Sequence, residues 1–250
     1  MVYSYIVCHY HEIGLKGGNR RFFEEKLVQN IKRGLGPQNF DWVKRFPGRI
    51  VIKLSNKAKL NSKKLKEILN CIFGISYFAF AQSTNSNIED IKKTALELIS
   101  QKRGKTFKIE TKRSDKKFPY SSQKINELVG EFILKNLKGK IVKLENPRIT
   151  CFIEILPKIS FLYLEKLRGP GGLPVTTSGK IVSLLSGGID SPVASYYLMK
   201  RGTKLVFVHF HAYPYTSKSS IEKVEKIVKT LNKFQFSSKL YLVPLSLIHI

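Results

Sequence analysis

The sequence is short of cysteine and acidic residues, and it has no long apolar run. Its 250 residues include three cysteines, Cys8, Cys71 and Cys151, whose wide spacing argues against a disulfide framework or a zinc site. No stretch is long and apolar enough to span a bilayer, and the first residues lack the basic n-region of a signal peptide. These absences favour a cytoplasmic protein without a membrane partner or a metal site of its own.

The shortage of acidic residues leaves a large positive charge. The chain has 44 Lys plus Arg against 18 Asp plus Glu, a formal net charge of +26. This excess favours a polyanionic partner, nucleic acid rather than an anionic membrane surface. A lysine-rich composition is also typical of AT-rich genomes, so charge alone leaves both explanations open. Residues 179–250 and the preceding residues are both basic, and we expect the partner to touch both parts.

The first 168 residues show an α+β pattern with mixed strands. Gly34 and Gly36 are expected to end the first helix, and the box Ser86-Asn87-Ile88-Glu89 to begin the third at Ser86. We place one section at residues 1–60 and a second at 61–168. Periodicity predicts strands at 2–8, 48–54, 76–81, 107–111, 150–156 and 160–164, and helices at 19–33, 63–69, 86–99 and 122–134.

The last part of the chain alternates strands and helices regularly. Residues 169–178 are rich in glycine and proline, as in a linker or a plain domain boundary. Beyond them, strands are predicted at 181–185, 205–210 and 240–245, and helices at 192–200 and 219–234. This alternation predicts a parallel, doubly wound α/β sheet. Such sheets usually have more than three strands, so we interpret this third domain, 179–250, as incomplete.

The strongest local signal is LLSGGIDSPVA at residues 184–194, between an apolar strand predicted to be buried and a helix. The carboxyl end of a strand is where α/β sheets bind ligands. Gly187 and Gly188 let the backbone approach phosphate oxygens, and Ser186 and Ser191 offer hydroxyls. Ser191 is also expected to cap the helix, whose free amides and dipole favour an anion. No Gly-Lys-Ser/Thr follows, so this is not a Walker A loop; the alternative is a glycine-rich turn without a ligand.

Two basic segments lie in the front part. Residues 12–20 (EIGLKGGNR) precede a helix and are either a phosphate contact or a solvated turn. Residues 112–120 (KRSDKKFPY) set basic residues beside aromatics, which suits RNA, because charge meets phosphate and rings stack on bases. The alternative is a solvated loop whose aromatics are buried in the core. The candidate RNA-binding residues are Lys16, Asn19, Arg20, Lys112, Arg113, Lys116 and Lys117.

In this order, the segments resemble one family, ThiI, the tRNA 4-thiouridine synthetases. The resemblance covers essentially the whole chain. It rests on EIxLKGxNR at 12–20, FGI at 73–75, KRxDKxFP at 112–119, GPGGLP at 169–174, SGGIDSPVA at 186–194, KRG at 200–202, VHF at 208–210 and PYTS at 214–217.

The resemblance implies a ferredoxin-like domain at 1–60, a THUMP domain at 61–168, a linker at 169–178 and a partial PP-loop ATP pyrophosphatase domain at 179–250. It implies that ATP with Mg²⁺ adenylates uridine 8 of a tRNA held near its acceptor-stem end, and that sulfur comes from a cysteine desulfurase. The implied catalytic residues are Asp190, Ser186 and Ser191. The implied ATP contacts are Leu184, Leu185, Ser186, Gly187, Gly188, Asp190, Ser191, His209 and Phe210.

The sequence leaves several alternatives open. His209 either contacts ATP or only caps neighbouring backbone. The family's PP-loop domain continues beyond residue 250 and carries the sulfur-transfer cysteine there, whereas the cysteines here are expected to be core residues. A non-catalytic tRNA-binding fragment is therefore the alternative to a tRNA sulfurtransferase. Amidation of a small carboxylate is disfavoured by the charge, while a homodimer and a role in thiamine thiazole synthesis stay open.

Overall fold

The computed structural model describes residues 3–212 and 218–245, so the predicted PYTS segment at 214–217 lies outside the described residues. The chain forms two compact units. The first comprises Met1–Cys8, Asn39–Leu60 and Phe78–Leu167, and the second His9–Gln38, Asn61–Tyr77 and Arg168–Ile250.

Among the described residues, nine strands form one mixed sheet that belongs mainly to the first unit. The order is β2-β3-β1-β4-β8-β7-β5-β6, with β9 beside β4. β5 pairs in parallel with β6 and β7, whereas the pairs β2–β3, β4–β8 and β7–β8 are antiparallel. The strands are β1 Tyr5–His9, β2 Phe40–Phe46, β3 Arg49–Leu54, β4 Tyr77–Asn85, β5 Thr106–Arg113, β6 Ile141–Val142, β7 Ile149–Ile155, β8 Ile159–Tyr163 and β9 Leu167–Arg168.

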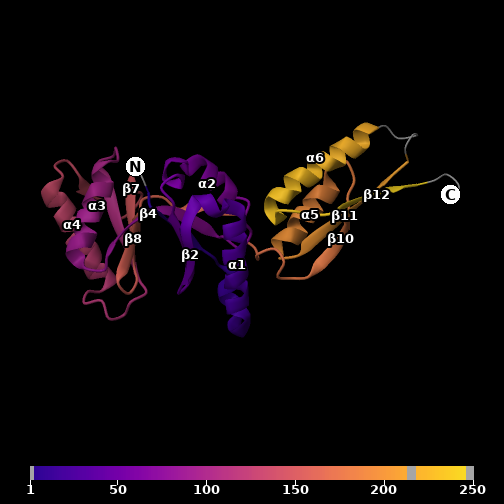
Figure 1. Cartoon of the computed structure of the whole chain (residues 1–250). Coiled ribbons are helices and arrows are strands. Elements are labelled where there is room, and N and C mark those ends of the chain that lie inside the picture. The colour runs from indigo at the N-terminus through magenta and orange to yellow at the C-terminus, as the bar shows by residue number, and fades with distance from the viewer. Residues whose placement is uncertain (1–2, 213–217, 246–250) are drawn as a thin grey trace. The chain divides into compact units, whose positions relative to one another are not determined.

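Two helices, α3 (Ile88–Ser100) and α4 (Ser122–Asn136), pack on this sheet and on each other (Figure 1). Their apolar faces meet Phe107 and Ile153 in a continuous core. The predicted cap of α3 at Ser86 is wrong. Asn87 is the cap, because its backbone is extended and its side chain accepts from Asp90 N at 2.8 Å, while the Ser86 hydroxyl donates to Leu156 O.

The sequence patterns did not predict β2. Charged residues at Asp41, Lys44 and Arg45 interrupt its apolar pattern, and only Val43 is buried. β2 lies at one end of the sheet order and pairs with β3 alone, with a register shift between Phe40 and Trp42. An edge strand needs only one apolar contact face, so it lacks the pattern of a central strand.

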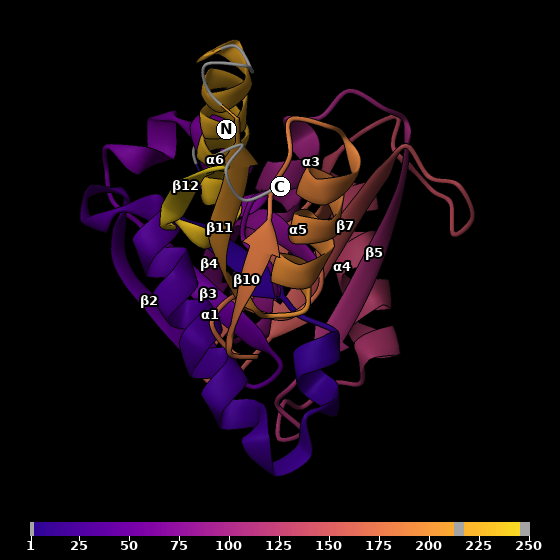
Figure 2. The same cartoon turned by 90° about the vertical axis from the view of Figure 1, so that its right-hand side faces the viewer.

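The second unit contains a parallel sheet of β10 (Lys180–Leu184), β11 (Lys204–His211) and β12 (Leu240–Pro244), side by side in that order (Figure 2). Helices α5 (Asp190–Lys200) and α6 (Lys218–Gln235) pack on it and on each other. The predicted parallel α/β pattern is confirmed. The prediction that the first strand is buried is wrong: Val182 and Leu184 are 62% and 64% exposed, because β10 is an edge strand in the described part of this sheet.

The second unit also contains α1 (Arg20–Leu35), α2 (Ser62–Leu69) and several 3-10 turns. Phe73 follows α2 and packs into the core of the parallel-sheet domain, where its ring contacts Tyr196 and Phe234. Asn30 of α1 is buried and donates to Val175 O. The turns are η1 Glu12–Leu15 and η2 Gly17–Asn19 in this unit, and η3 Pro37–Asn39 and η4 Ala58–Leu60 elsewhere along the chain.

Residues 169–178, which we call the connector, are tightly packed rather than loose. Gly171 exchanges backbone hydrogen bonds with the segment after α2, accepting from Gly74 N and donating to Ile75 O, both at 2.8 Å. Leu173 N donates to Lys200 O at 2.9 Å, at the end of α5. The FGI, GPGGLP and KRG motifs therefore meet in space, and the connector fixes the parallel-sheet domain against the loop after α2.

Candidate nucleotide loop and RNA-binding segments

The loop after β10 lies at the carboxyl edge of the parallel sheet. β10 ends at Leu184, which is level with Val208 of β11, and Leu185 N donates to Val208 O at 2.8 Å. Residues Ser186–Ile189 then lead into α5, which begins at Asp190. The parallel register brings His209 and Phe210 to the same edge. All residues expected to contact ATP thus come together here.

Two serines hold the loop from inside. Ser191 Oγ accepts from Ser186 N at 2.9 Å and lies 3.0 Å from Ser186 Oγ, which accepts from Gly188 N at 3.2 Å. The expected capping of α5 by Ser191 is wrong. Ile189 occupies the cap position without a side-chain hydrogen bond, because the Ser191 hydroxyl is turned back to the loop. The first amides of α5 are consequently left without a side-chain acceptor and suit an anion.

The two loop glycines have no structural need to be glycine. Neither has a positive φ angle. A methyl group on Gly188 would meet Ser186 Oγ at 3.4 Å, and one on Gly187 would meet Lys223 Cδ at 3.4 Å, both ordinary contacts. Neither the backbone conformation nor crowding by neighbouring atoms explains why these two positions are glycine. The absence of side chains at both positions leaves the loop backbone accessible to a phosphate group.

The four residues that flank the loop differ in burial and in the hydrogen-bonding groups that they leave unpaired. Leu185 is buried in the core, and its carbonyl accepts from His209 Nδ1 at 2.8 Å. His209 therefore binds the neighbouring backbone, which is one of the two alternatives considered for it. Its ring is buried, yet Nε2 has no partner among the described residues, so a ligand contact stays available. Leu184 and Phe210 are exposed at the sheet edge.

Asp190 is exposed at the first residue of α5. A carboxylate at this place is favoured by the helix dipole and lies beside the open loop. Among the described residues, no group of three or more His, Cys, Asp and Glu could hold a metal ion. A cation in this loop would therefore need oxygens from the nucleotide in addition to Asp190.

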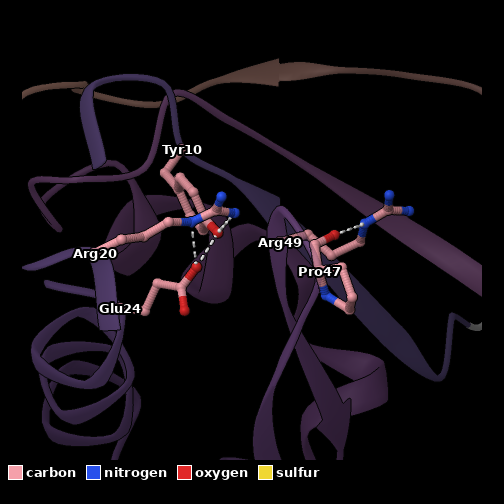
Figure 3. A network of polar contacts seen from close by, with 5 residues as sticks. All are labelled: Tyr10, Arg20, Glu24, Pro47 and Arg49. Carbon is pink, nitrogen blue, oxygen red and sulfur yellow. Dashed lines mark hydrogen bonds and ion pairs between the residues drawn. The ribbon is translucent and has the colours of Figure 1, made fainter. Parts of the chain in front are cut away.

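The basic segment that leads into α1 is braced at Arg20 by two residues outside it, Tyr10 and Glu24. Figure 3 shows Arg20 between Tyr10 and Glu24: its Nη2 donates to Tyr10 Oη at 2.8 Å and its Nε to Glu24 Oε1 at 2.9 Å. Tyr10 in turn donates to Glu24, and burial raises the pKa of its phenol, which keeps it a donor. Lys16 Nζ lies 5.0 Å from the centre of the Phe23 ring.

The sequence patterns missed Tyr10 and Glu24 as partners of Arg20, although the spacing of Arg20 and Glu24 is typical of a helical ion pair. Asn19 occupies the cap position of α1 without a side-chain hydrogen bond. Lys16, Asn19 and Arg20 thus lie together at one helix start, and Arg20 is committed to protein partners.

The second basic segment leaves β5 and turns into α4. Arg113 Nη1 donates to Phe118 O at 3.1 Å and to Tyr120 O at 2.6 Å, so its guanidinium holds the loop closed. The Phe118 side chain is buried in the core and Tyr120 is 37% exposed. The alternative of an aromatic ring buried in the core is therefore confirmed for Phe118, while stacking of Tyr120 on RNA stays a prediction. The exposed cations that the loop presents are Lys112, Lys116 and Lys117.

A buried ionic network anchors this loop at its base. Arg49 of β3 pairs with Glu154 of β7, and Tyr163 donates to the same carboxylate at 2.7 Å. Arg49 also donates to Ser114 Oγ at 2.6 Å and, through Nε, to Pro47 O, the second pair drawn in Figure 3. Removing one partner of such a pair leaves a buried charge uncompensated, at a cost of about 3–5 kcal/mol. The network therefore fixes where the basic loop begins.

The three cysteines are poor nucleophiles. Cys8 and Cys151 are fully buried, and burial raises the pKa of the Cys151 thiol to about 12 and that of Cys8 higher still. Cys71 is half-buried, and desolvation raises its pKa although Lys233 opposes the shift. The expectation of core residues is confirmed for Cys8 and Cys151 and is wrong for Cys71. A thiol that stays protonated at neutral pH is a weak sulfur acceptor.

Three protein families match the chain in order. The ThiI ferredoxin-like domain matches residues 5–79, the THUMP domain 85–165 and the family described as Thiamine biosynthesis protein (ThiI) 176–249.

Among the described residues, no helix has the length and apolar character needed to cross a membrane.

Curated relatives are similar over nearly the whole chain. A probable tRNA sulfurtransferase from Thermoanaerobacter pseudethanolicus is 41% identical over 95% of this chain, and one from Bacillus subtilis is 39% identical over 98%. This chain spans 61% of the length of each of them.

Two solved structures share the fold with TM-scores of 0.83. One is a 4-thiouridine synthetase in complex with RNA and bound ATP; it is 36% identical, and the match covers 97% of this chain and 62% of that one. The other is PH1313 from Pyrococcus horikoshii, 28% identical, with 97% and 80% covered.

The fold and the loop define a protein in which ferredoxin-like and THUMP domains precede an α/β PP-loop domain, as the sequence predicted. The chain belongs to the ThiI family. The chain spans about three fifths of the length of these relatives.

Proposed function

We propose that this chain is the RNA-binding and ATP-using part of a tRNA sulfurtransferase that makes 4-thiouridine at position 8. The observation that carries the proposal is the loop of residues 186–191, with two glycines that the protein itself does not require and uncapped amides at the start of α5. The sequence relatives and the ATP-bound structure of a 4-thiouridine synthetase support the same activity.

In this proposal the loop binds ATP together with Mg²⁺. The α5 amides hold phosphate oxygens, Asp190 is the carboxylate for the Mg²⁺ that ATP brings, and the strand ends carrying Leu184, His209 and Phe210 flank the nucleoside. The uridine oxygen attacks the α-phosphorus and pyrophosphate leaves. The outer sulfur of a persulfide, which a cysteine desulfurase supplies, then attacks the adenylated carbon and displaces AMP. A second thiol cleaves the remaining S–S bond, which releases the thiouridine and leaves a disulfide.

The tRNA, held near its acceptor-stem end, is assigned to the front domains. Lys112, Lys116 and Lys117 are the exposed cations of the anchored loop, and Lys16 and Asn19 supply a second contact at the start of α1. None of the three cysteines suits the sulfur carrier, so the proposal assigns that role to no residue of this chain. A homodimer, a cytoplasmic location and a role in thiamine thiazole synthesis complete the proposal.

The test is pyrophosphate release from ATP and Mg²⁺, measured with and without unmodified tRNA. We expect release that depends on tRNA and is abolished by Asp190→Ala, with tRNA affinity nearly unchanged. Asp41→Ala, an exposed carboxylate on β2, is the matched control and should release pyrophosphate normally.

Two other outcomes identify the alternatives. Salt-sensitive tRNA binding without any pyrophosphate release would indicate a non-catalytic RNA-binding chain. Loss of tRNA affinity together with pyrophosphate release in Asp190→Ala would contradict the division between an RNA-binding front and an ATP loop.

A further inference from the structure

A lysine of α6 lies against the nucleotide loop and has no role in the assignments above. A methyl group built on Gly187 would lie 3.4 Å from Lys223 Cδ and 4.0 Å from Lys223 Cε. The side-chain stem of Lys223 therefore runs alongside the backbone of the loop. Lys223 is in the second turn of α6, and helical side chains lean toward the N-terminus of their helix. That end of α6 follows β11 at the carboxyl edge of the sheet, where the loop lies.

The charge of Lys223 is not neutralised by its own helix. The α6 carboxylates are Glu222 and Glu225, one and two positions away, and residues at those spacings do not face each other on a helix. The positions three and four away are Ser219, Ser220, Lys226 and Ile227. No ion pair of Lys223 occurs within the described part of the chain. By contrast, Lys92 on α3 and Lys124 on α4 each pair with a glutamate three positions away.

A lysine whose stem runs beside Gly187, close to the uncapped amides of α5, is suited to an anion with several charged oxygens. We propose that Lys223 binds the polyphosphate of the nucleotide in this loop, an inference that rests on the proposed ATP-dependent function. Lysine acts there as a mobile point charge, as in other phosphate sites. During adenylation the bond between the α- and β-phosphates breaks and its electrons leave with pyrophosphate. A cation on that group stabilises the charge that develops.

The test compares three ligands on three forms of the chain. The affinities of ATP, pyrophosphate and AMP are measured with Mg²⁺ for the parent chain, for Lys223→Met and for Lys229→Met. Lys229 is an exposed lysine of the same helix, six positions further along and so on another face. We expect Lys223→Met to weaken ATP and pyrophosphate about tenfold and to leave AMP unchanged, because a contact to a phosphate contributes on this scale. Lys229→Met should match the parent for all three ligands.

The outcomes separate this inference from the proposed function. Lys223→Arg should restore much of the pyrophosphate affinity, since a guanidinium also binds phosphate. Unchanged ATP affinity in Lys223→Met, or an equal loss for ATP and AMP, would overturn the role of Lys223 while leaving the ATP loop in place. A parent chain that binds neither ATP nor pyrophosphate would overturn the proposed function itself, and this inference with it.

Discussion

The connector and the nucleotide loop are two glycine-rich segments of one compact unit, and their glycines are constrained in opposite ways. A methyl group on Gly169 would lie 2.3 Å from Ile75 O, and one on Gly172 would lie 2.3 Å from Lys200 O. The loop glycines, Gly187 and Gly188, would meet nothing closer than 3.4 Å. In the connector, the protein itself fills the space where a side chain would be. In the loop, a methyl group would make only ordinary contacts.

The difference shows that a glycine-rich motif has two distinct physical causes. At Gly169 and Gly172 of the connector, neighbouring backbone approaches too closely for any Cβ, so these two glycines are a requirement of folding. The loop is free of that requirement, and in the proposed function its glycines serve the nucleotide. The comparison predicts that substitutions in the two segments affect different measurements: stability in the connector and nucleotide affinity in the loop.

The largest expected effect is that of Gly172→Ala on stability. This position combines a φ angle of +76° with contacts of 2.3 Å to Lys200 O and 2.6 Å to Lys200 Cγ. The strain of a left-handed backbone and the forced shift at the end of α5 together should cost about 3 kcal/mol or more. The measurement is the free energy of unfolding from urea titration of the whole chain.

Gly171→Ala is the matched control for that prediction. Gly171 has a similar φ angle of +68°, but a methyl group there would meet nothing within 4 Å. The loss of stability in Gly171→Ala should therefore come only from the strain of a left-handed backbone, about 1–2 kcal/mol. Equal losses for the two variants would mean that conformation alone, and not the close approach to Lys200, makes the connector rich in glycine.

The next effect in size is that of Gly188→Ala on ligand binding. The free energy of unfolding should stay within about 0.5 kcal/mol of the parent, because the residue is exposed and its φ angle is not positive. ATP affinity should fall about tenfold, since the methyl group takes space needed by phosphate. Isothermal titration with ATP and Mg²⁺ measures the affinity. A variant that unfolds more readily yet binds ATP as the parent does would reverse the comparison.

Much of this arrangement could be predicted from the sequence, because the relevant signals are local. The strand before residue 185, the helix after residue 190 and the turn between them follow from periodicity and residue type. Long-range contacts could not be predicted in the same way. Nothing local to Arg49 indicates Glu154 of β7, and no pattern marked the connector as packed rather than loose. The spacing of Arg20 and Glu24 was a usable local signal, but the third partner, Tyr10, lies in a different segment.

The hydroxyl of Ser191 illustrates a further limit. A serine just before a helical proline is typical of a helix cap, and that was the expectation. The structure instead uses the hydroxyl as an acceptor for Ser186 N, five residues earlier, and leaves the helix start open. A serine that caps a helix and a serine that accepts a hydrogen bond from the preceding loop have the same sequence signal. Only the position of the loop backbone distinguishes them.

The smallest expected effect tests whether charge helps to hold the connector. Arg201 follows α5 and pairs with Glu12 of η1 at 2.6 Å, next to the backbone bridge between Leu173 and Arg201. The Arg201 side chain is 62% exposed, so the pair is largely solvated and should contribute only about 0.5 kcal/mol, decreasing as salt is added. Urea titrations of Arg201→Ala and the parent at low and high salt measure this difference. If close backbone packing holds the connector, Arg201→Ala will stay far less destabilising than Gly172→Ala at every salt concentration. A loss comparable with that of Gly172→Ala would show that the ion pair, rather than the glycines, fixes the connector.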